Sequence, residues 1–419
     1  MRFLAGILFV LLLAGSARGG AINRYSSMSA EYIANPNRYA TIEPDGAFYN
    51  PAGVAFGPEG GSLNLDNQVT MGVEGFTQGG RSVSKTQWAP ICPALSVTYR
   101  RGDWALYFGS GLIGVGGTEL KGQHPAFFEN KPYLISQVND LQFGGGNVVQ
   151  DARFDNTTLR ATSFLAGAFT GVAYRVSDAV SLSLGGKIAY AWGGVEVASE
   201  FELYSPDLRW FYEDSLELVV DHRGGGGSLT AGLHWKVSDA FQVAFRGETS
   251  TRIKLHTVAE VDTVDLFEDE SVSRSDIPGT VSLGWVYKLS PELRVMGSAA
   301  WFFNEQANYG ELLGFDITGK LEAAWEVGGG VEYRVLDDLV LKAGYLRFVT
   351  GFRDHTRTSV RFGLDAHYVN GGATYRFGEN WSGTGGVMAM IFDSATERTG
   401  HTTLEPFALV MGMGLNYRF

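Results

Sequence analysis

Phe407-Ala408-Leu409-Val410-Met411-Gly412-Met413-Gly414-Leu415-Asn416-Tyr417-Arg418-Phe419 is the stretch that decides the fold. Every second residue from Phe407 to Phe419 is large and apolar or aromatic, and the residues between them are small or polar apart from Val410. A period of two with one apolar face indicates a half-buried β-strand. This strand carries an aromatic and a basic residue, Tyr417-Arg418, at its end.

The same pairing of an aromatic with a basic residue recurs along the chain. Its seven copies are Tyr99-Arg100, Tyr174-Arg175, Trp235-Lys236, Tyr287-Lys288, Tyr333-Arg334, Tyr375-Arg376 and Tyr417-Arg418. The first six run into short polar turns and therefore predict six hairpins. With a first strand at 62–76 and a last strand at 404–419, the total is fourteen, an even number that can close into a membrane barrel.

The position of the aromatics favours a membrane barrel over a soluble β-sandwich. The segments 229–237, 281–289 and 325–333 alternate in the same way, and each aromatic lies on the apolar face at one end of its strand. An aromatic girdle at the membrane boundary has this placement. Long loops are then expected at the opposite end, at 77–91, 116–160, 204–227, 257–276, 305–320, 351–358 and 393–403.

The first residues predict export. Arg2, the apolar run 4–13 and the small residues around 15–21 have the pattern of a signal peptide, so we expect 1–21 to be removed. Beyond it, no run of eighteen apolar residues predicts a membrane helix. Cys92 is the one cysteine, which leaves no internal disulfide. The formal charge of −12, with no basic stripe, argues against nucleic acid as a partner.

Between the leader and the first strand, the stretch 45–53 predicts a rigid turn. Asn50 can hydrogen-bond to its own downstream backbone, Pro51 fixes one φ angle, and Gly53 permits positive φ. Phe48 and Tyr49 are apolar anchors that need a packed surface. One interpretation is an ordinary loop that leads into the barrel; the other is a plug. We predict that 22–61 form a hatch inside the barrel and that 62–419 form the barrel.

The chain resembles the FadL-type long-chain fatty-acid transporters of the bacterial outer membrane. Asn50-Pro51-Ala52 matches the Asn-Pro-Ala signature of that family, and the strand number and the aromatic end also agree. The resemblance implies an N-terminal hatch, ligand capture at the outward loops, passive passage of hydrophobic molecules and a kinked third strand that opens the wall. The stretch 25–41 departs from the family because it lacks a glycine-rich run.

Three sets of candidate site residues follow. Gly109, Gly111 and Gly114 in the expected third strand indicate a kink, either as a lateral gate or as close packing against the hatch. An apolar capture groove is expected in the longest loop, at Phe127, Phe128, Tyr133, Leu134 and Ile135. A fatty-acid carboxylate needs a cation nearby, and the candidates at the outward end are Lys121, Lys131, Arg153, Arg160 and Lys320.

The predicted function is passive uptake of hydrophobic small molecules, foremost long-chain fatty acids, by an all-β transmembrane barrel in the outer membrane. Aromatic hydrocarbons are an alternative cargo, and an open polar porin is an alternative of another class. No His-Glu-x-x-His or Gly-x-Ser-x-Gly pattern occurs, so we expect no enzyme, cofactor or metal. The expected partners are the ligand, outer-membrane lipid and lipopolysaccharide, around a monomer.

Overall fold

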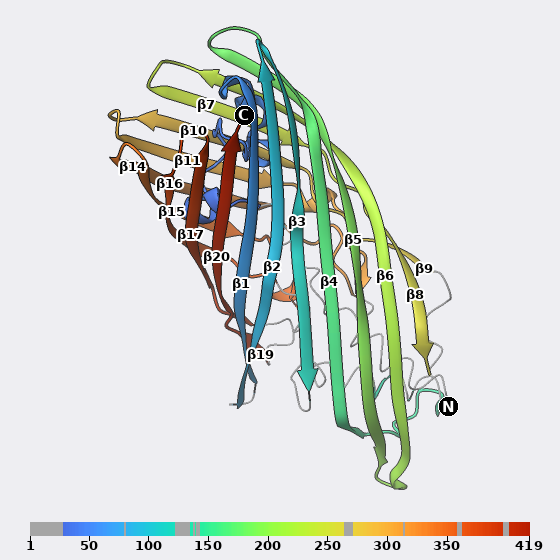
Figure 1. Ribbon diagram of the computed structural model, residues 1–419. Helices are drawn as coiled ribbons and strands as arrows, with labels where there is room; N and C mark the ends of the chain where they lie inside the picture. The colour runs from blue at the N-terminus through green and yellow to red at the C-terminus, as the bar shows by residue number, and fades with distance from the viewer. Residues whose placement is uncertain are drawn as a thin grey trace.

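The computed structural model describes a closed antiparallel barrel, seen in Figure 1. It describes residues 28–78, 81–121, 135–136, 139, 143–263, 271–312, 315–357, 363–396 and 402–419. In this part of the chain fourteen strands form the wall: β1 (Gly60–Gln78), β2 (Arg81–Arg101), β3 (Trp104–Lys121), β4 (Asp151–Arg175), β5 (Val180–Ser205), β6 (Arg209–Lys236), β7 (Phe241–Glu248), β10 (Thr280–Lys288), β11 (Leu293–Phe302), β14 (Ala324–Leu336), β15 (Leu339–Val349), β16 (Ala366–Arg376), β17 (Trp381–Phe392) and β20 (Phe407–Arg418).

The barrel closes because β1 pairs with both β2 and β20. In the register of β1 with β20, Ser62 lies opposite Arg418 and Val73 lies opposite Phe407. Closure leaves no free sheet edge, which a sheet in lipid requires. The predicted fold class, a transmembrane antiparallel barrel of fourteen strands, is confirmed.

The wall is much taller on one side than on the other. Strands β4, β5 and β6 contain 25, 26 and 28 residues, whereas β7, β10 and β11 contain 8, 9 and 10. Figure 1 shows the long strands reaching far beyond the rest of the wall at the end opposite the short turns. On this side β8 (Lys254–Asp262) pairs with the outer half of β6, and β9 (Ser271–Arg274) pairs with β8. The seventh and eighth strands are thus each interrupted once.

The remaining short strands and 3₁₀ turns lie at the end of the barrel opposite the short turns. The hairpin β12 (Glu311–Leu312) to β13 (Phe315–Asp316) and the short strands β18 (Ala395–Thr396) and β19 (Thr402–Leu404) lie in segments predicted as loops. Two 3₁₀ turns, η4 (Asn304–Gln306) and η5 (Asp354–Thr356), accompany them.

The predicted turns lie where the sequence placed them, but the predicted loops are too long. The loop expected at 77–91 is wrong, because β1 runs to Gln78 and β2 starts at Arg81 in register with it. These residues lack the apolar alternation because strands that extend beyond the membrane have no lipid on their outer face. Their pairing rests on backbone hydrogen bonds, which leave no side-chain pattern.

Aromatic side chains line the outer surface at two levels. Near the turns, the rings of Trp104 and Tyr174 are 4.6 Å apart and those of Trp381 and Tyr417 are 4.4 Å apart. Ten residues further along β4, Phe164 stacks on Trp192 at 5.4 Å. A membrane-crossing strand needs about 9–11 residues, so the two levels mark the two faces of a bilayer. In bacteria such barrels span the outer membrane, and this barrel belongs there.

Helices are few and short. Among the described residues, no helix has the length and the apolar character needed to cross a membrane.

Candidate functional site

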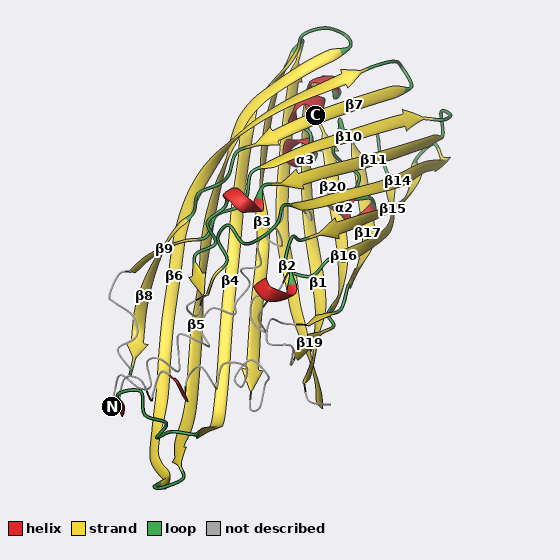
Figure 2. Ribbon diagram, turned by 180° about the vertical axis from the view of Figure 1, so that it is seen from behind, coloured by secondary structure: helices red, strands yellow, loops and turns green. Residues whose placement is uncertain are grey.

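The residues before β1 form a compact segment inside the barrel. This inner segment, residues 28–57, contains α2 (Ala30–Ala34), α3 (Gly46–Tyr49) and η3 (Pro51–Phe56), and nearly all of it is buried. Figure 1 shows it in blue within the barrel near the short turns, and the helices drawn red in Figure 2 agree. A Cβ atom would lie within 3 Å of the inner segment at nine wall glycines spread around the barrel: Gly109, Gly111, Gly284, Gly328, Gly330, Gly344, Gly372, Gly386 and Gly412. Part of the glycine excess therefore makes room for this segment.

The Asn-Pro-Ala motif is fixed to the wall through Asn50. The Asn50 side-chain amide donates to the carbonyl oxygen of Thr41 at 2.8 Å and to Nδ1 of His234 at 2.8 Å. The other ring nitrogen, Nε2, lies 3.1 Å from Oε1 of Gln242 and donates to it. His234 is thus a neutral imidazole with its proton on Nε2. It is fully buried and joins β6 and β7 to the inner segment.

Ala52 makes the second connection between the motif and the wall. Its carbonyl oxygen accepts a hydrogen bond from Ser181 Oγ at 2.7 Å. Both residues are fully buried, so this bond is shielded from water. The two residue types of the motif therefore have separate tasks. Asn50 supplies a side-chain amide that donates hydrogen bonds, and the small side chain of Ala52 lets its own backbone carbonyl come close to β5.

Phe48 and Tyr49 are the packed anchors that the sequence suggests. The Phe48 ring meets the Phe169 ring edge to face at 5.5 Å. The Tyr49 ring stacks on Tyr32 at 5.3 Å, and its hydroxyl accepts a hydrogen bond from the Met28 backbone at 3.0 Å. Both anchors are at least 98% buried. They form one apolar cluster with the wall.

Replacing Gly53 by alanine should loosen the inner segment. A Cβ at this position would lie 2.3 Å from both Asn50 Nδ2 and the Thr41 carbonyl oxygen, so the hydrogen bond between them has to break or shift. We expect a loss of about 1–3 kcal/mol in the local opening free energy of residues 28–57, measured by hydrogen exchange. Gly247→Ala is the matched control, because its Cβ would meet nothing within 4 Å. Equal protection in the two variants would contradict this account.

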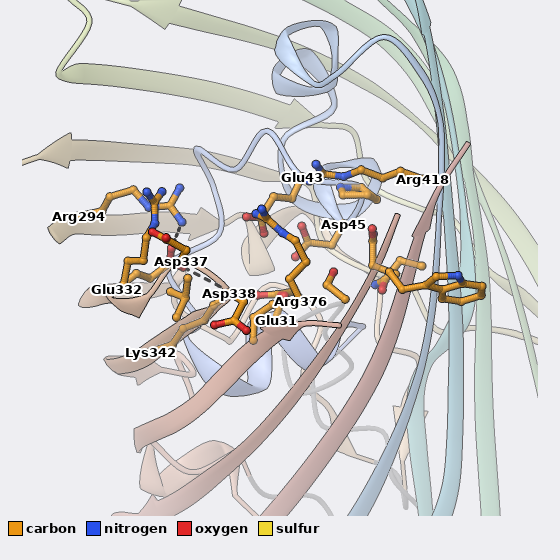
Figure 3. A pocket seen from close by; sticks show the side chains of 18 of the residues that line it. Glu31, Glu43, Asp45, Arg294, Glu332, Asp337, Asp338, Lys342, Arg376 and Arg418 are labelled. Carbon is orange, nitrogen blue, oxygen red and sulfur yellow. Dashed lines mark hydrogen bonds and ion pairs between the residues drawn. The ribbon is translucent and has the colours of Figure 1, made fainter. Parts of the chain in front are cut away.

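A buried ionic network joins the inner segment to the opposite wall. Arg38 donates to Asp45 at 2.8 Å and also contacts Glu43 and, at 3.5 Å, Glu332. Glu332 in turn pairs with Arg294. Figure 3 shows members of this network converging: Glu43 and Asp45 from the inner segment, Arg294 from β11 and Glu332 from β14, with Lys342 of β15 beside them. Because Arg38 has only 4% of its side chain exposed, its partners are needed to compensate its charge.

The pKa values reflect this crowding. Burial raises the pKa of the Asp45 carboxyl, and Arg38 offsets only part of that rise. For Glu43, burial also acts to raise the pKa, but the positive charges of Arg38 and Lys342 outweigh it and leave the pKa below its ordinary value. Burial acts to lower the pKa of Arg38, yet Asp45 and Glu43 hold that pKa well above its ordinary value.

A polar cavity of about 480 Å³ lies next to this network, at the end of the barrel that carries the short turns. Its lining includes the basic members of four of the seven aromatic–basic pairs: Lys288, Arg334, Arg376 and Arg418. Their aromatic neighbours are exposed on the outer surface or partly so. The repeated dipeptide therefore marks the point where the wall has lipid outside and a charged mouth inside.

An apolar layer of wall side chains packs against the inner segment on the side away from the short turns. The buried members of this apolar layer that come from the wall form one cluster with Phe48, Tyr49 and Tyr32. They are Ala94, Ile113, Leu165, Phe169, Ala189, Ile253, Leu255, Ile277, Ala300, Phe302, Ala324, Leu346, Phe348, Ala366, Tyr368, Met388 and Val410. The rings of Phe302 and Phe348 meet edge to face at 6.3 Å across β11 and β15. Such a lining suits apolar molecules and disfavours water and sugars.

A charged cluster lies at the edge of the apolar layer. Glu248 on β7 pairs with Lys187 on β5 and with Arg246, and it accepts a hydrogen bond from Ser228 Oγ at 3.1 Å. All three charged side chains are at least 93% buried, so one carboxylate lies between two cations away from bulk water. The Arg246 Nε atom is buried and has no hydrogen-bond partner among the described residues. The next inward residue after Lys187 is Ala189, a member of the apolar layer.

Sequence reasoning missed this charged cluster. Arg246 and Glu248 stand two residues apart on the inward face of one strand, and that spacing was the available signal. Nothing in the sequence indicated that Lys187, some sixty residues earlier, would meet them.

The third strand separates from the second along its outer half. The pairing of β2 with β3 ends at Ala94 opposite Gly111, although β2 stays paired with β1 to the end and β3 stays paired with β4. In the described chain, the outer parts of these two strands, 81–93 and 112–121, have no register with each other. A bulge falls between Leu112 and Gly114. We call this separation the β2–β3 gap.

The three candidate kink glycines lie at the base of the gap. A Cβ at Gly109 would lie 2.3 Å from the Phe48 ring, and one at Gly111 would lie 2.8 Å from Met28 Cε. Gly109 and Gly111 thus provide room for the inner segment, while Gly114 borders the bulge.

The outer candidates are only partly described. Ile135 lies in a helical turn and is half-buried, whereas Phe127, Phe128, Lys131, Tyr133 and Leu134 lie outside the described residues. Lys121 is the last residue of β3, and Lys320 is exposed in a turn after β13. Arg153 and Arg160 are exposed residues of β4 that pair with Glu202 and Glu196, each at 3.4 Å. The described side chains among these candidates, Arg153, Arg160 and Lys320, do not form one cluster with a shared partner.

Comparisons with known proteins agree with this architecture. No protein-family model and no curated protein matches the chain. Among solved structures, a FadL homologue from Pseudomonas aeruginosa aligns with a TM-score of 0.65 at 16% identity, over 97% of this chain and 99% of that one. The toluene transporter TodX from Pseudomonas putida aligns with a TM-score of 0.66 at 15% identity, over 94% and 99%.

The toluene transporter TbuX from Ralstonia pickettii is similar as well, with a TM-score of 0.56 at 14% identity, over 92% of this chain and 98% of that one. At these identities the likeness is one of fold. The resemblance to FadL-type barrels is confirmed at that level: the chain has the fourteen-stranded barrel fold of the FadL homologue and of the toluene transporters TodX and TbuX.

Proposed function

We propose that this protein is an outer-membrane channel for the passive uptake of hydrophobic small molecules, and that its cargo is long-chain fatty acids. The apolar layer supports the broad class, because a lumen lined by such side chains favours apolar cargo. The inner segment acts as the hatch, since it fills the barrel below that layer and blocks free diffusion of polar solutes. An open general porin would need a clear, polar lumen.

The charged cluster is the observation that carries the choice of cargo. Lys187 and Arg246 give two positive charges against the negative charge of Glu248, and Arg246 Nε has no hydrogen-bond partner within the described part of the chain. A buried excess cation is costly unless an anion compensates it. A fatty-acid carboxylate supplies that anion while its chain occupies the apolar layer. The FadL homologue and the toluene transporters share this fold, but toluene carries no charge and would leave the cation uncompensated.

The β2–β3 gap is the proposed exit. A cargo in the apolar layer lies close to Ile113 and Leu165, which belong to the strands on one side of the gap. An amphiphile that leaves sideways enters the membrane without passing the hatch. The capture groove of the outer loop and its five apolar residues remain the proposed entry.

The proposed function is tested by transport across vesicles whose outer leaflet is lipopolysaccharide. Vesicles with the intact protein should take up oleate faster than empty vesicles, and they should not pass sucrose. Faster toluene entry without faster oleate entry would support the aromatic alternative and overturn the choice of cargo. Sucrose passage through the intact protein would overturn the hatch.

Cross-linking β2 to β3 tests the exit. Cys92 of β2 is the single cysteine and is buried next to the gap. Ile113 of β3 lies two residues beyond the last paired position, where continued pairing would place it opposite Cys92. In an Ile113→Cys variant, a short disulfide-containing bifunctional reagent should join the two thiols and reduce oleate uptake at least tenfold. Reduction should restore uptake.

The wild-type protein treated with the same reagent is the control, because it carries only one thiol. Undiminished uptake after complete cross-linking would show that cargo leaves by another route.

A further inference from the structure

The outward face of the tall wall carries a groove just beyond the upper aromatic level. Trp192 lies ten residues along β5 from Leu182, and Phe164 lies ten residues along β4 from Tyr174. Because about 9–11 residues cross the hydrocarbon core, the residues that follow these two aromatics stand at the level of lipid headgroups. Charged side chains begin there: Glu196 on β5 and Arg160 on β4.

The groove has a volume of about 430 Å³ and crosses four strands. Its upper and lower edges are two cross-strand rows, one with Trp192, Arg223 and His256, the other with Arg160 and Glu196. The row between them is hollow, because Gly194 has no side chain there. A Cβ at this position would lie 2.5 Å from the Asp221 carboxylate, which leans across the glycine.

Charge is distributed unevenly along the groove. Arg160 is paired with Glu196 at 3.4 Å. Arg223 is exposed beside Trp192 and forms no ion pair with any described residue. His256, its neighbour on β8, is exposed as well. At the edge of the groove next to the aromatic level, the Arg223 guanidinium is therefore available to bind a group in the headgroup layer.

We propose that this groove binds the phosphorylated headgroup of an outer-leaflet glycolipid, with the phosphate on Arg223. A guanidinium matches phosphate with paired hydrogen bonds, and the adjoining aromatic rings contact the upper part of the acyl chains. Asp221 in the middle row and Glu260 at the far edge repel a free anion, so an anion gains a place here only when acyl chains hold it against the barrel. The groove thus selects an anchored phosphate.

This proposal depends on the position of the groove in the membrane and is independent of the cargo of the lumen. Its test uses the full-length protein in an uncharged detergent, with native mass spectrometry to measure binding of diphosphorylated lipid A, of the same lipid without phosphates, and of inorganic phosphate. Diphosphorylated lipid A should bind, and the other two should bind at least tenfold more weakly.

Arg223→Gln should weaken lipid A binding about ten- to hundredfold, the loss of a hydrogen bond to a charged group. Arg209→Gln, an equal charge change at the tip of the same strand, should leave binding unchanged. Equal binding of the phosphorylated and dephosphorylated lipids, or equal binding by the two variants, would overturn the proposal. So would inorganic phosphate binding as tightly as lipid A, because the ligand would then be a free anion. Oleate uptake should be the same in both variants.

Discussion

Arg246→Met should weaken binding of fatty acids by about ten- to hundredfold and leave binding of the corresponding fatty alcohols unchanged. The variant removes the excess cation but keeps the pair of Lys187 with Glu248, so the barrel should remain folded. The expected loss is that of a charge-assisted hydrogen bond inside a poorly solvated lumen. Dissociation constants for dodecanoate and dodecanol, measured by calorimetry on the purified protein, provide the comparison.

Arg246→Lys serves as the control because it retains the positive charge. It should keep most of the preference for the acid over the alcohol. A methionine variant that binds acid and alcohol as the wild type does would show that the charged cluster holds the wall together and plays no part in recognising cargo.

Arg38→Ala should destabilise the packing of the hatch, residues 28–57, inside the barrel. Sucrose should then enter vesicles that carry this variant, whereas vesicles with the wild-type protein exclude it. The change leaves Asp45 buried without its cation and removes one of the cations near Glu332, which keeps Arg294. Removing one partner of a buried ion pair costs about 3–5 kcal/mol, which is comparable to the stability of a small packed segment. Hydrogen exchange of residues 28–57 should rise in parallel with the sucrose flux.

Arg353→Ala is the matched control. Arg353 pairs with Glu322 at the outer end, but both side chains are more than half exposed. Exposed pairs contribute little, so sucrose should stay excluded. Sucrose exclusion by Arg38→Ala itself would mean that the ionic network does not hold the hatch in place.

Much of the wall follows from alternation and turn chemistry alone. Tyr333-Arg334 before the turn at Asp337 and Asp338 places one hairpin, and β14 and β15 pair across it as expected. The interruption between β7 and β8 did not follow, because both pieces pair with the same strand and only the register on β6 separates them. The height of β4 to β6 was also missed, because the apolar residues of those ends, such as Val197 and Phe201, face inward and the outward face carries no apolar stripe for lipid.

The site was predictable in its local parts and unpredictable in its distant ones. The rigid corner at Asn50, Pro51 and Gly53 could be read from three residue types. Its partner His234 is 184 residues away and reaches it only through barrel closure and strand register. The same holds for Lys187 and Glu248, which are 61 residues apart. Non-local pairs of this kind are decided by topology, which a local pattern does not contain.

The central claim is that a fatty acid occupies the lumen with its carboxylate at the charged cluster and its chain in the apolar layer. The most direct measurement is a crystal structure of the protein with 12-bromododecanoate, using the anomalous scattering of bromine to place the end of the chain. We expect a carboxylate within hydrogen-bond distance of Arg246 and a bromine peak among residues of the apolar layer, such as Ile253, Phe302 and Phe348. Bromine peaks confined to the outer surface of the barrel, with the lumen empty, would contradict it.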